Sequence, residues 1–232
     1  MSFESNHSQD HLSLREAALE RQLKEIETWA DTQGAGIDAG IKETVALCNL
    51  LGLPTAQSCE GHFGDSARHG FPAPWIRVSA PNEPELRHAH EAETYQRIAK
   101  KYGVTVEAVR RARNESAWVE AQKLLANEEE TEEYRAWSLE NEKLLTMASA
   151  MLNEFYQSHS TEEDSRLIAD AHSSGFDIHN GGKFYIPIAD AERMRTELTA
   201  AEQESLPNIH KACQEEMRVF TEFLKQKYFA EN

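Results

Sequence analysis

Apolar positions recur along the chain in two rhythms, one typical of helices and one typical of strands. In some stretches leucine, isoleucine and valine return every three or four residues, which indicates a helix with one buried face. In others, short apolar runs are bounded by glycine, proline and asparagine, which is typical of strands. We therefore expect helices at residues 12–29, 38–51, 84–157, 189–201 and 207–229, and strands at 55–59, 75–79, 166–171, 176–178 and 183–188.

Single residues mark several boundaries between these elements. Asp38 is a suitable N-cap for the helix that it precedes, and Gly52 follows the end of that helix. Gly103 interrupts the long helical stretch, and Asn180-Gly181-Gly182 predicts a hairpin turn between the last two strands. Residues 1–11 are polar, and we expect them to be frayed.

The strands fall into two groups that are separated by the long helical stretch. Because strands that follow one another in sequence tend to be neighbours in a sheet, the simplest arrangement is one small mixed sheet. It would be built from the strands near 55–79 and 166–188 and flanked by helices. This predicts an α+β (or α/β) core formed by residues 1–82 and 160–232, with residues 83–159 as a helical insertion.

Composition and charge narrow the class of protein. Of the 232 residues, 40% are hydrophobic and 28% are charged, which is enough to bury a core. The net charge of −16 opposes general binding to nucleic acid or to anionic membranes. The sequence has no apolar run near the roughly 20 residues of a membrane span, no secretory signal and an odd, scattered set of three cysteines. We therefore expect a cytoplasmic protein with no membrane partner.

The turn from Gln57 to His62 holds the most informative chemistry, because Cys59, Glu60 and His62 follow one another at the end of a predicted strand. In open sheets, ligand sites are favoured at the carboxyl ends of the strands. Metal binding by Cys59 and His62, completed by His69 or Asp65, would suit zinc or another divalent metal, and Glu60 would act as a base. Thiol catalysis would instead use Cys59 as a nucleophile, activated by one of the histidines.

A third hypothesis for this turn is simple recognition of a small-molecule ligand. Ser58 and the backbone around Gly61 would then cradle an anion. If the two groups of strands share a sheet, His179 and Asn180 would add an imidazole and an amide from the second hairpin. The Cys-x-x-His pair is only half of a metal motif, so its other half must come from His69 or from this hairpin.

A basic segment stands out within the helical stretch. Residues 97–113 carry six bases against one acid, a local charge of +5. The segment resembles the helix-turn-helix of bacterial DNA-binding proteins, with small Ala99 before the turn residue Gly103 and Val109 after it. The resemblance implies nucleic-acid contact from the second helix through Arg110, Arg111 and Arg113.

The turn also carries a family resemblance. Together with Gly36–Ile41 and Pro74-Trp75-Ile76, it resembles a group of uncharacterised bacterial proteins that share a Ser-Cys-Glu-Gly-His turn. More distantly it is similar to the wybutosine-synthesis methyltransferases of tRNA modification, which have Ser-Cys-Ser-Gly-Arg there. This chain has Glu60 and His62 in place of that serine and arginine.

These observations favour a small-molecule or nucleotide-processing enzyme, a metal-dependent hydrolase, with Cys59, Glu60 and His62 as its catalytic residues. The first alternative is a nucleic-acid-binding or tRNA-modification-related protein that uses the basic segment. The second is a protein-interaction scaffold that uses acidic helices, since Asn127–Lys143 holds seven acids against two bases. Such a segment is also typical of a solvated helix face.

Overall fold

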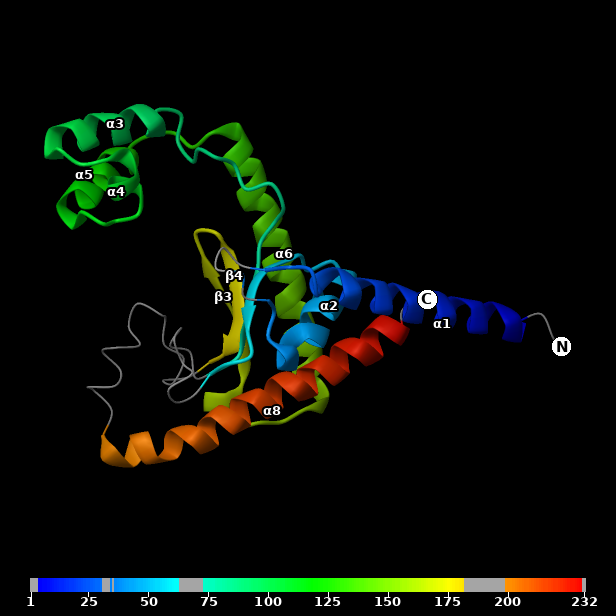
Figure 1. Ribbon diagram of the computed structural model, residues 1–232. Coiled ribbons are helices and arrows are strands. Elements are labelled where there is room, and N and C mark those ends of the chain that lie inside the picture. The colour runs from blue at the N-terminus through cyan, green and yellow to red at the C-terminus, as the bar shows by residue number, and fades with distance from the viewer. Residues whose placement is uncertain (1–3, 31–33, 35, 63–72, 182–198, 231–232) are drawn as a thin grey trace. The chain divides into compact units, whose positions relative to one another are not determined.

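The computed structural model describes residues 4–30, 34, 36–62, 73–181 and 199–230 (Figure 1). The chain divides into two compact units: unit 1 is Met1–Ser79 with Lys143–Asn232, and unit 2 is Ala80–Glu142. Residues from Lys143 onward thus group with unit 1, whereas the sequence analysis placed the end of the insertion at residue 159. Within the described residues, no helix is long and apolar enough to cross a membrane.

Unit 1 contains a four-stranded sheet with the order β1-β2-β4-β3. Its strands are β1 (Thr55–Cys59), β2 (Trp75–Val78), β3 (Leu167–His172) and β4 (Gly175–Asn180). Strands from the two sequence groups meet where β2 pairs with β4, so the α+β class and the shared sheet are confirmed. All three pairs are antiparallel, whereas a mixed sheet was expected.

A hairpin that precedes the predicted one joins β3 to β4. Its turn precedes Gly175, whose φ of +121° few other residues adopt. Asn180 is the last residue of β4 and pairs with Leu167. The predicted hairpin partner, 183–188, lies outside the described residues, so the hairpin at Asn180-Gly181-Gly182 stays a prediction.

The two faces of the sheet have opposite character. Side chains of paired residues lie on one face, and successive residues alternate between the faces. One face is apolar and buried, and it carries Ile76, Val78, Leu167, Phe176 and Ile178. Figure 1 shows α2 (Lys42–Leu50), α8 (Ala200–Ala230) and the end of α6 (Glu132–Ser158) together on one side of the strands. The apolar face and these helices form the core of unit 1.

Two of the terminal helices are longer than predicted. The first, α1 (Glu4–Ile26), begins before residue 12, because no glycine or proline interrupts its polar start. It ends at Ile26, where the Thr28 hydroxyl donates to the Glu25 carbonyl at 2.7 Å. The last, α8, begins at Ala200 and continues through Pro207, where a helix start was expected. Proline removes one hydrogen bond there, and the buried face of the following turns holds the helix.

The opposite face of the sheet is polar. Its central contact is the ion pair of Arg77 with Asp177, in which Nε and Nη2 donate to the two carboxylate oxygens at 2.8 and 3.0 Å. His172 Nε2 lies 3.1 Å from the same carboxylate, and the Arg77 guanidinium lies 5.5 Å from the Trp75 ring centre. Burial tends to raise the pKa of Asp177, but Arg77 and His172 outweigh it and hold that pKa below its ordinary value.

Asp177→Asn should therefore cost stability at neutral pH and much less in acid. Because the pKa of Asp177 is lowered on folding, folding favours the ionised carboxylate. This stabilisation is complete above the ordinary pKa of about 3.9 and is lost as the pH falls through the lower folded-state value. Urea unfolding at about pH 7 and about pH 3 would measure the difference between wild type and variant. An equal difference at both pH values would contradict the prediction.

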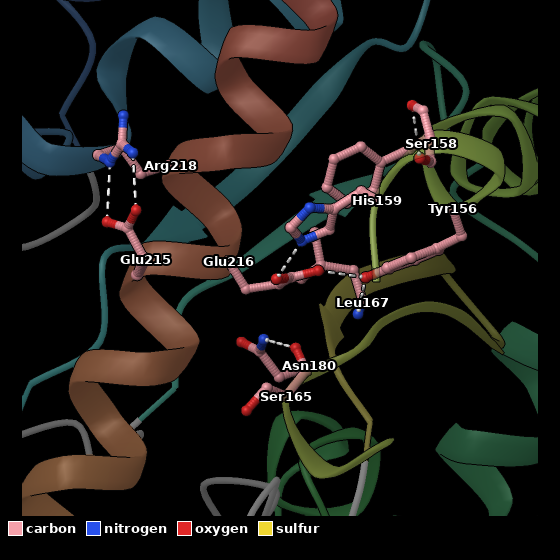
Figure 2. A network of polar contacts seen from close by, with 10 residues as sticks. Tyr156, Ser158, His159, Ser165, Leu167, Asn180, Glu215, Glu216 and Arg218 are labelled. Carbon is pink, nitrogen blue, oxygen red and sulfur yellow. Dashed lines mark hydrogen bonds and ion pairs between the residues drawn. The ribbon is translucent and has the colours of Figure 1, made fainter. Parts of the chain in front are cut away.

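A buried polar network joins α6 to α8 and to the sheet (Figure 2). Glu216 of α8 is 4% exposed, and it accepts from the Tyr156 hydroxyl at 2.8 Å and lies 2.9 Å from His159 Nε2. The Tyr156 oxygen in turn accepts from the Leu167 amide at 2.6 Å. Burial and the bond to Glu216 raise the pKa of Tyr156, so its hydroxyl stays a donor. This network therefore holds two helices and the start of β3 together.

Unit 2 contains a three-helix cluster with its own core. Its helices are α3 (Glu91–Tyr102), α4 (Val106–Arg110) and α5 (Glu115–Leu125). Ala99 and Val109 are buried in one cluster, and Gly103 caps α3 with a φ of +64°. The helix after this turn is much shorter than predicted: it ends at Arg110, so Arg111 and Arg113 lie beyond it. The backbone turns at Ala112, with a φ of +51°, and Asn114 caps the next helix.

The two ends of unit 2 are bonded to each other. The Ala80 amide donates to Asn141 Oδ1 at 2.8 Å, and the Ala80 carbonyl accepts from Trp137 Nε1 at 2.9 Å. Both polar groups of this one peptide residue are thus held by side chains of α6. The entry and the exit of the insertion are consequently fixed side by side.

Candidate metal centre

Three side chains with metal-binding atoms converge at the end of β1. Asp38, Cys59 and His62 each offer one donor atom, and these atoms all lie within 4.8 Å of one another. Cys59 is buried, whereas Asp38 and His62 are each 29% exposed at the side chain. The group therefore lies at the margin of the core, with two of its three side chains partly exposed.

Asp38 enters this group because it does not act as a helix cap. The helix after it begins as a short 3₁₀ turn, Ala39–Ile41, and the Asp38 carboxylate makes no capping bond. It accepts instead from the Glu60 amide and meets His62 Nε2, each at 3.1 Å. The predicted capping role of Asp38 is therefore wrong, and its carboxylate binds the turn 22 residues later.

Glu60 makes a second bond between the turn and the segment before α2. Its Oε2 accepts from the Gly40 amide at 2.6 Å. A Cβ at residue 40 would lie 2.7 Å from that oxygen, so the Glu60 carboxylate would have to move if residue 40 carried a side chain. Gly61, with a φ of +81°, completes the turn, and its amide points to Cys59 Sγ at 3.4 Å. Two reciprocal carboxylate–amide bonds thus hold the donors in place.

The spacing of the donors suits a tetrahedral ion. Bonds of about 2.0–2.3 Å around zinc place neighbouring ligand atoms roughly 3.3–3.8 Å apart. Small side-chain rotations therefore bring three atoms that lie within 4.8 Å to that spacing. Thiolate, imidazole and carboxylate together are donors typical of zinc. Three protein ligands also leave a fourth position open, as in catalytic zinc sites.

The protonation of Cys59 bears on the thiol-catalysis hypothesis. Burial raises the pKa of the Cys59 thiol to about 11, an effect opposed by the Gly61 amide and strengthened by Asp38 and Glu60. A nucleophilic cysteine needs the opposite, a lowered pKa and nearby positive charge. A bound cation would supply such a charge, because a coordinated thiol is deprotonated. The electrostatics around Cys59 therefore oppose the nucleophile role.

Helix α8 reaches the turn from outside the triad. Gln214 Nε2 donates to the Glu60 carbonyl at 3.2 Å, and His210 lies beside the backbone of Gly61. Burial lowers the pKa of His210, an effect that the Gly61 backbone opposes and that nearby His62 strengthens. Both side chains therefore act on the peptide units between two candidate ligands.

The other predicted site residues lie apart from the triad. Ser58 alternates with Cys59 and so lies on the other face of the sheet, in the row of Ile76. His179 shares the face of Cys59 but stands two strands away, with Trp75 between them. Asn180 lies on the apolar side, where its amide donates to the Ser165 carbonyl at 2.5 Å. His69 and Asp65 lie outside the described residues.

His179 has a defined state although it is distant from the triad. Burial lowers the pKa of its ring, against the bond to the Asn180 backbone and the charge of Asp170. Nδ1 lies 2.8 Å from the Asn180 carbonyl oxygen, which only a protonated nitrogen can satisfy. Nε2 lies 3.7 Å from an Asp170 oxygen. His179 is therefore a neutral imidazole on the face of the sheet that also carries Cys59.

Sequence reasoning missed three residues of this site: Asp38, His210 and Gln214. Asp38 precedes a predicted helix, so its position in the sequence was explained by a capping role and did not indicate a metal ligand. His210 and Gln214 gave none, because more than 140 residues separate them from the turn that they contact. A search for known relatives adds nothing to these assignments: no protein-family model, curated protein or solved structure matches the chain.

Proposed function

We propose that this protein is a metal-dependent enzyme, a hydrolase of small molecules or nucleotides, with a divalent ion held by Asp38, Cys59 and His62. The observation that carries the proposal is the convergence of their three donor atoms within 4.8 Å at the partly exposed end of β1. Zinc is the ion that such a donor set favours. Zinc with three protein ligands supplies Lewis acidity and activates water for attack on ester, amide and phosphoester bonds.

The remaining residues have separate roles in this proposal. Asp38 and His62 share a hydrogen bond at 3.1 Å, and an ion would replace the proton that now lies between them. Glu60 is the candidate general base, as the order of residues in the turn predicts. Its Oε2 is engaged by the Gly40 amide, so its other oxygen would take up the proton. The Asp38 and His62 side chains are each 29% exposed, so a substrate would reach the ion from their side.

The metal is tested on protein purified without a histidine tag. We expect about one zinc ion per chain by elemental analysis, or uptake of zinc by the stripped protein. Asp38→Asn, Cys59→Ser and His62→Ala should each lose most of this binding. His90→Ala is the matched control, because His90 is an exposed histidine of unit 2. Failure of the wild-type chain to hold or take up zinc, iron or manganese would overturn the proposal.

The enzymatic role needs a separate measurement. Glu60→Gln keeps an oxygen for the Gly40 amide but loses basicity. We expect this variant to bind zinc normally and to hydrolyse activated ester and phosphodiester probes about 100-fold more slowly. Equal rates for Glu60→Gln and wild type would remove Glu60 as the base. A zinc-loaded protein that hydrolyses neither class of probe would contradict the hydrolase role.

A second candidate function rests on unit 2. Arg97, Lys100, Arg110 and Arg113 are exposed on the three-helix cluster, and such side chains bind phosphates. Lys101 and Arg111 differ, because they are paired with Glu120 and Glu107. Salt-dependent binding to DNA or RNA that is lost in Arg110→Ala/Arg113→Ala, and kept in Lys101→Ala, would support this function. No binding at low salt would exclude it.

A further inference from the structure

Helix α8 contributes two side chains to the turn that carries the metal ligands, although neither belongs to the triad. His210 and Gln214 are four residues apart, so they lie on one face of the helix. Gln214 Nε2 donates to the Glu60 carbonyl at 3.2 Å, and His210 lies beside the backbone of Gly61. Glu60 and Gly61 are the two residues between Cys59 and His62.

Among the described residues, two parts of unit 1 contact the backbone of this turn. The segment before α2 holds it through Asp38, which accepts from the Glu60 amide. Helix α8 holds it through Gln214, with His210 beside Gly61. Within the turn itself, the Gly61 amide contacts Cys59 Sγ. Loss of the two α8 side chains would therefore weaken the support of the turn.

The turn needs this support because of its own conformation. Gly61 has a φ of +81°, and glycine loses more conformational freedom on folding than any other residue. A shift of this one peptide unit moves Cys59 and His62 relative to each other. Residues that orient metal ligands in this way change metal affinity by 10- to 100-fold in other proteins.

We propose that His210 and Gln214 are positioning residues of the metal site, through which α8 sets the separation of Cys59 and His62. The inference rests on the proposed metal binding. The coupling is reciprocal. If the α8 contacts strengthen metal binding, then a bound ion strengthens the contacts between α8 and the turn by the same free energy.

The test compares two variants with two matched neighbours. His210→Leu and Gln214→Leu remove the polar contacts and keep an apolar side chain of similar length. Lys211→Leu and Glu215→Leu make the same change one position further along, at exposed residues of the same helix. Zinc affinity is measured by competition with a chromophoric chelator, and the site geometry by the visible spectrum of the cobalt-loaded protein.

We expect His210→Leu and Gln214→Leu to bind zinc about 10- to 100-fold more weakly than wild type and to alter the cobalt spectrum. The two neighbours should match wild type in both measurements. Thermal unfolding of the metal-free proteins separates positioning from general damage, and we expect each variant to stay within a few degrees of its neighbour control.

The outcomes distinguish this inference from the proposed function. If wild type binds zinc and both variants bind it equally well with an unchanged cobalt spectrum, the positioning role is wrong and the metal site stands. If the weaker binding is matched by an equal loss of stability in the metal-free protein, the role is structural and the inference is also overturned. If wild type binds no metal, the proposed function itself fails.

Discussion

Glu216→Ala is expected to lower the free energy of unfolding of unit 1 by about 3–5 kcal/mol. Glu216 is 4% exposed, and both of its oxygens are engaged, one by the Tyr156 hydroxyl and one by His159 Nε2. Its loss leaves the Tyr156 hydroxyl and His159, whose side chains are partly buried, without their acceptor and opens a cavity between α6 and α8. The cost is large because the cavity and the two lost hydrogen bonds add together.

Urea unfolding measures this cost, and two further variants calibrate it. Tyr156→Phe removes the donor to Glu216 and the acceptor of the Leu167 amide, so it should cost about 1–3 kcal/mol. Glu215→Ala changes the adjacent residue, which pairs with Arg218 at the surface, and should stay within ~0.5 kcal/mol of wild type. A Glu216→Ala protein as stable as the Glu215→Ala protein would show that the network does not hold the helices.

Gly175→Ala should be about as damaging, by roughly 3–5 kcal/mol, for a different reason. The φ of +121° at Gly175 lies in a region that residues with a Cβ rarely adopt. An added Cβ would also overlap the Val78 carbonyl oxygen and lie 3.1 Å from Ser79 Cα. Both contacts are with backbone, which cannot move aside as a flexible side chain would. The start of the β3–β4 hairpin therefore has no room for a side chain.

Gly52→Ala is the control for backbone strain alone. Gly52 has a φ of +82° in the same unit, and an added Cβ would meet only Met147 Cε at an ordinary 3.6 Å. We expect a cost of about 1–2 kcal/mol there. Calorimetry of wild type, Gly52→Ala and Gly175→Ala separates the cost of backbone strain from the cost of the overlap with Val78. If Gly175→Ala loses no more stability than Gly52→Ala, the overlap with Val78 is relieved by a small shift and the prediction is wrong.

The sequence predicts those parts of the fold that depend on local periodicity. The strand at 55–59 and the helix after Asp38 lie close to where residue alternation and helical spacing place them. The predicted strands at 166–171 and 176–178 correspond to β3 and β4, which pair along their whole length. The turn between them at Ser173-Ser174-Gly175 has a weaker local signal than Asn180-Gly181-Gly182, whose predicted partner strand lies outside the described residues.

The candidate site was predicted only in part, for a related reason. Cys59 and His62 are neighbours in sequence, so their proximity is a local property that the residue order indicates. Asp38 and Gln214 reach the same turn from 22 and 154 residues away, through side-chain bonds to backbone atoms. Such contacts leave no spacing pattern in the chain. Only the tertiary packing of α8 and of the segment before α2 places these two residues at the turn.

The bonds that join Ala80 to Asn141 and Trp137 have a consequence for the order of folding. The central strand pair of the sheet joins Arg77 to Asp177, so closing it directly means closing a loop of 100 residues. Once unit 2 has folded from its local helices, its joined ends shorten that loop to roughly 40 residues, which reduces the entropic cost of closure by about 0.8 kcal/mol. The insertion thus holds its own two ends together, and early folding of its helices favours pairing of β2 with β4, the two strands that it separates in sequence.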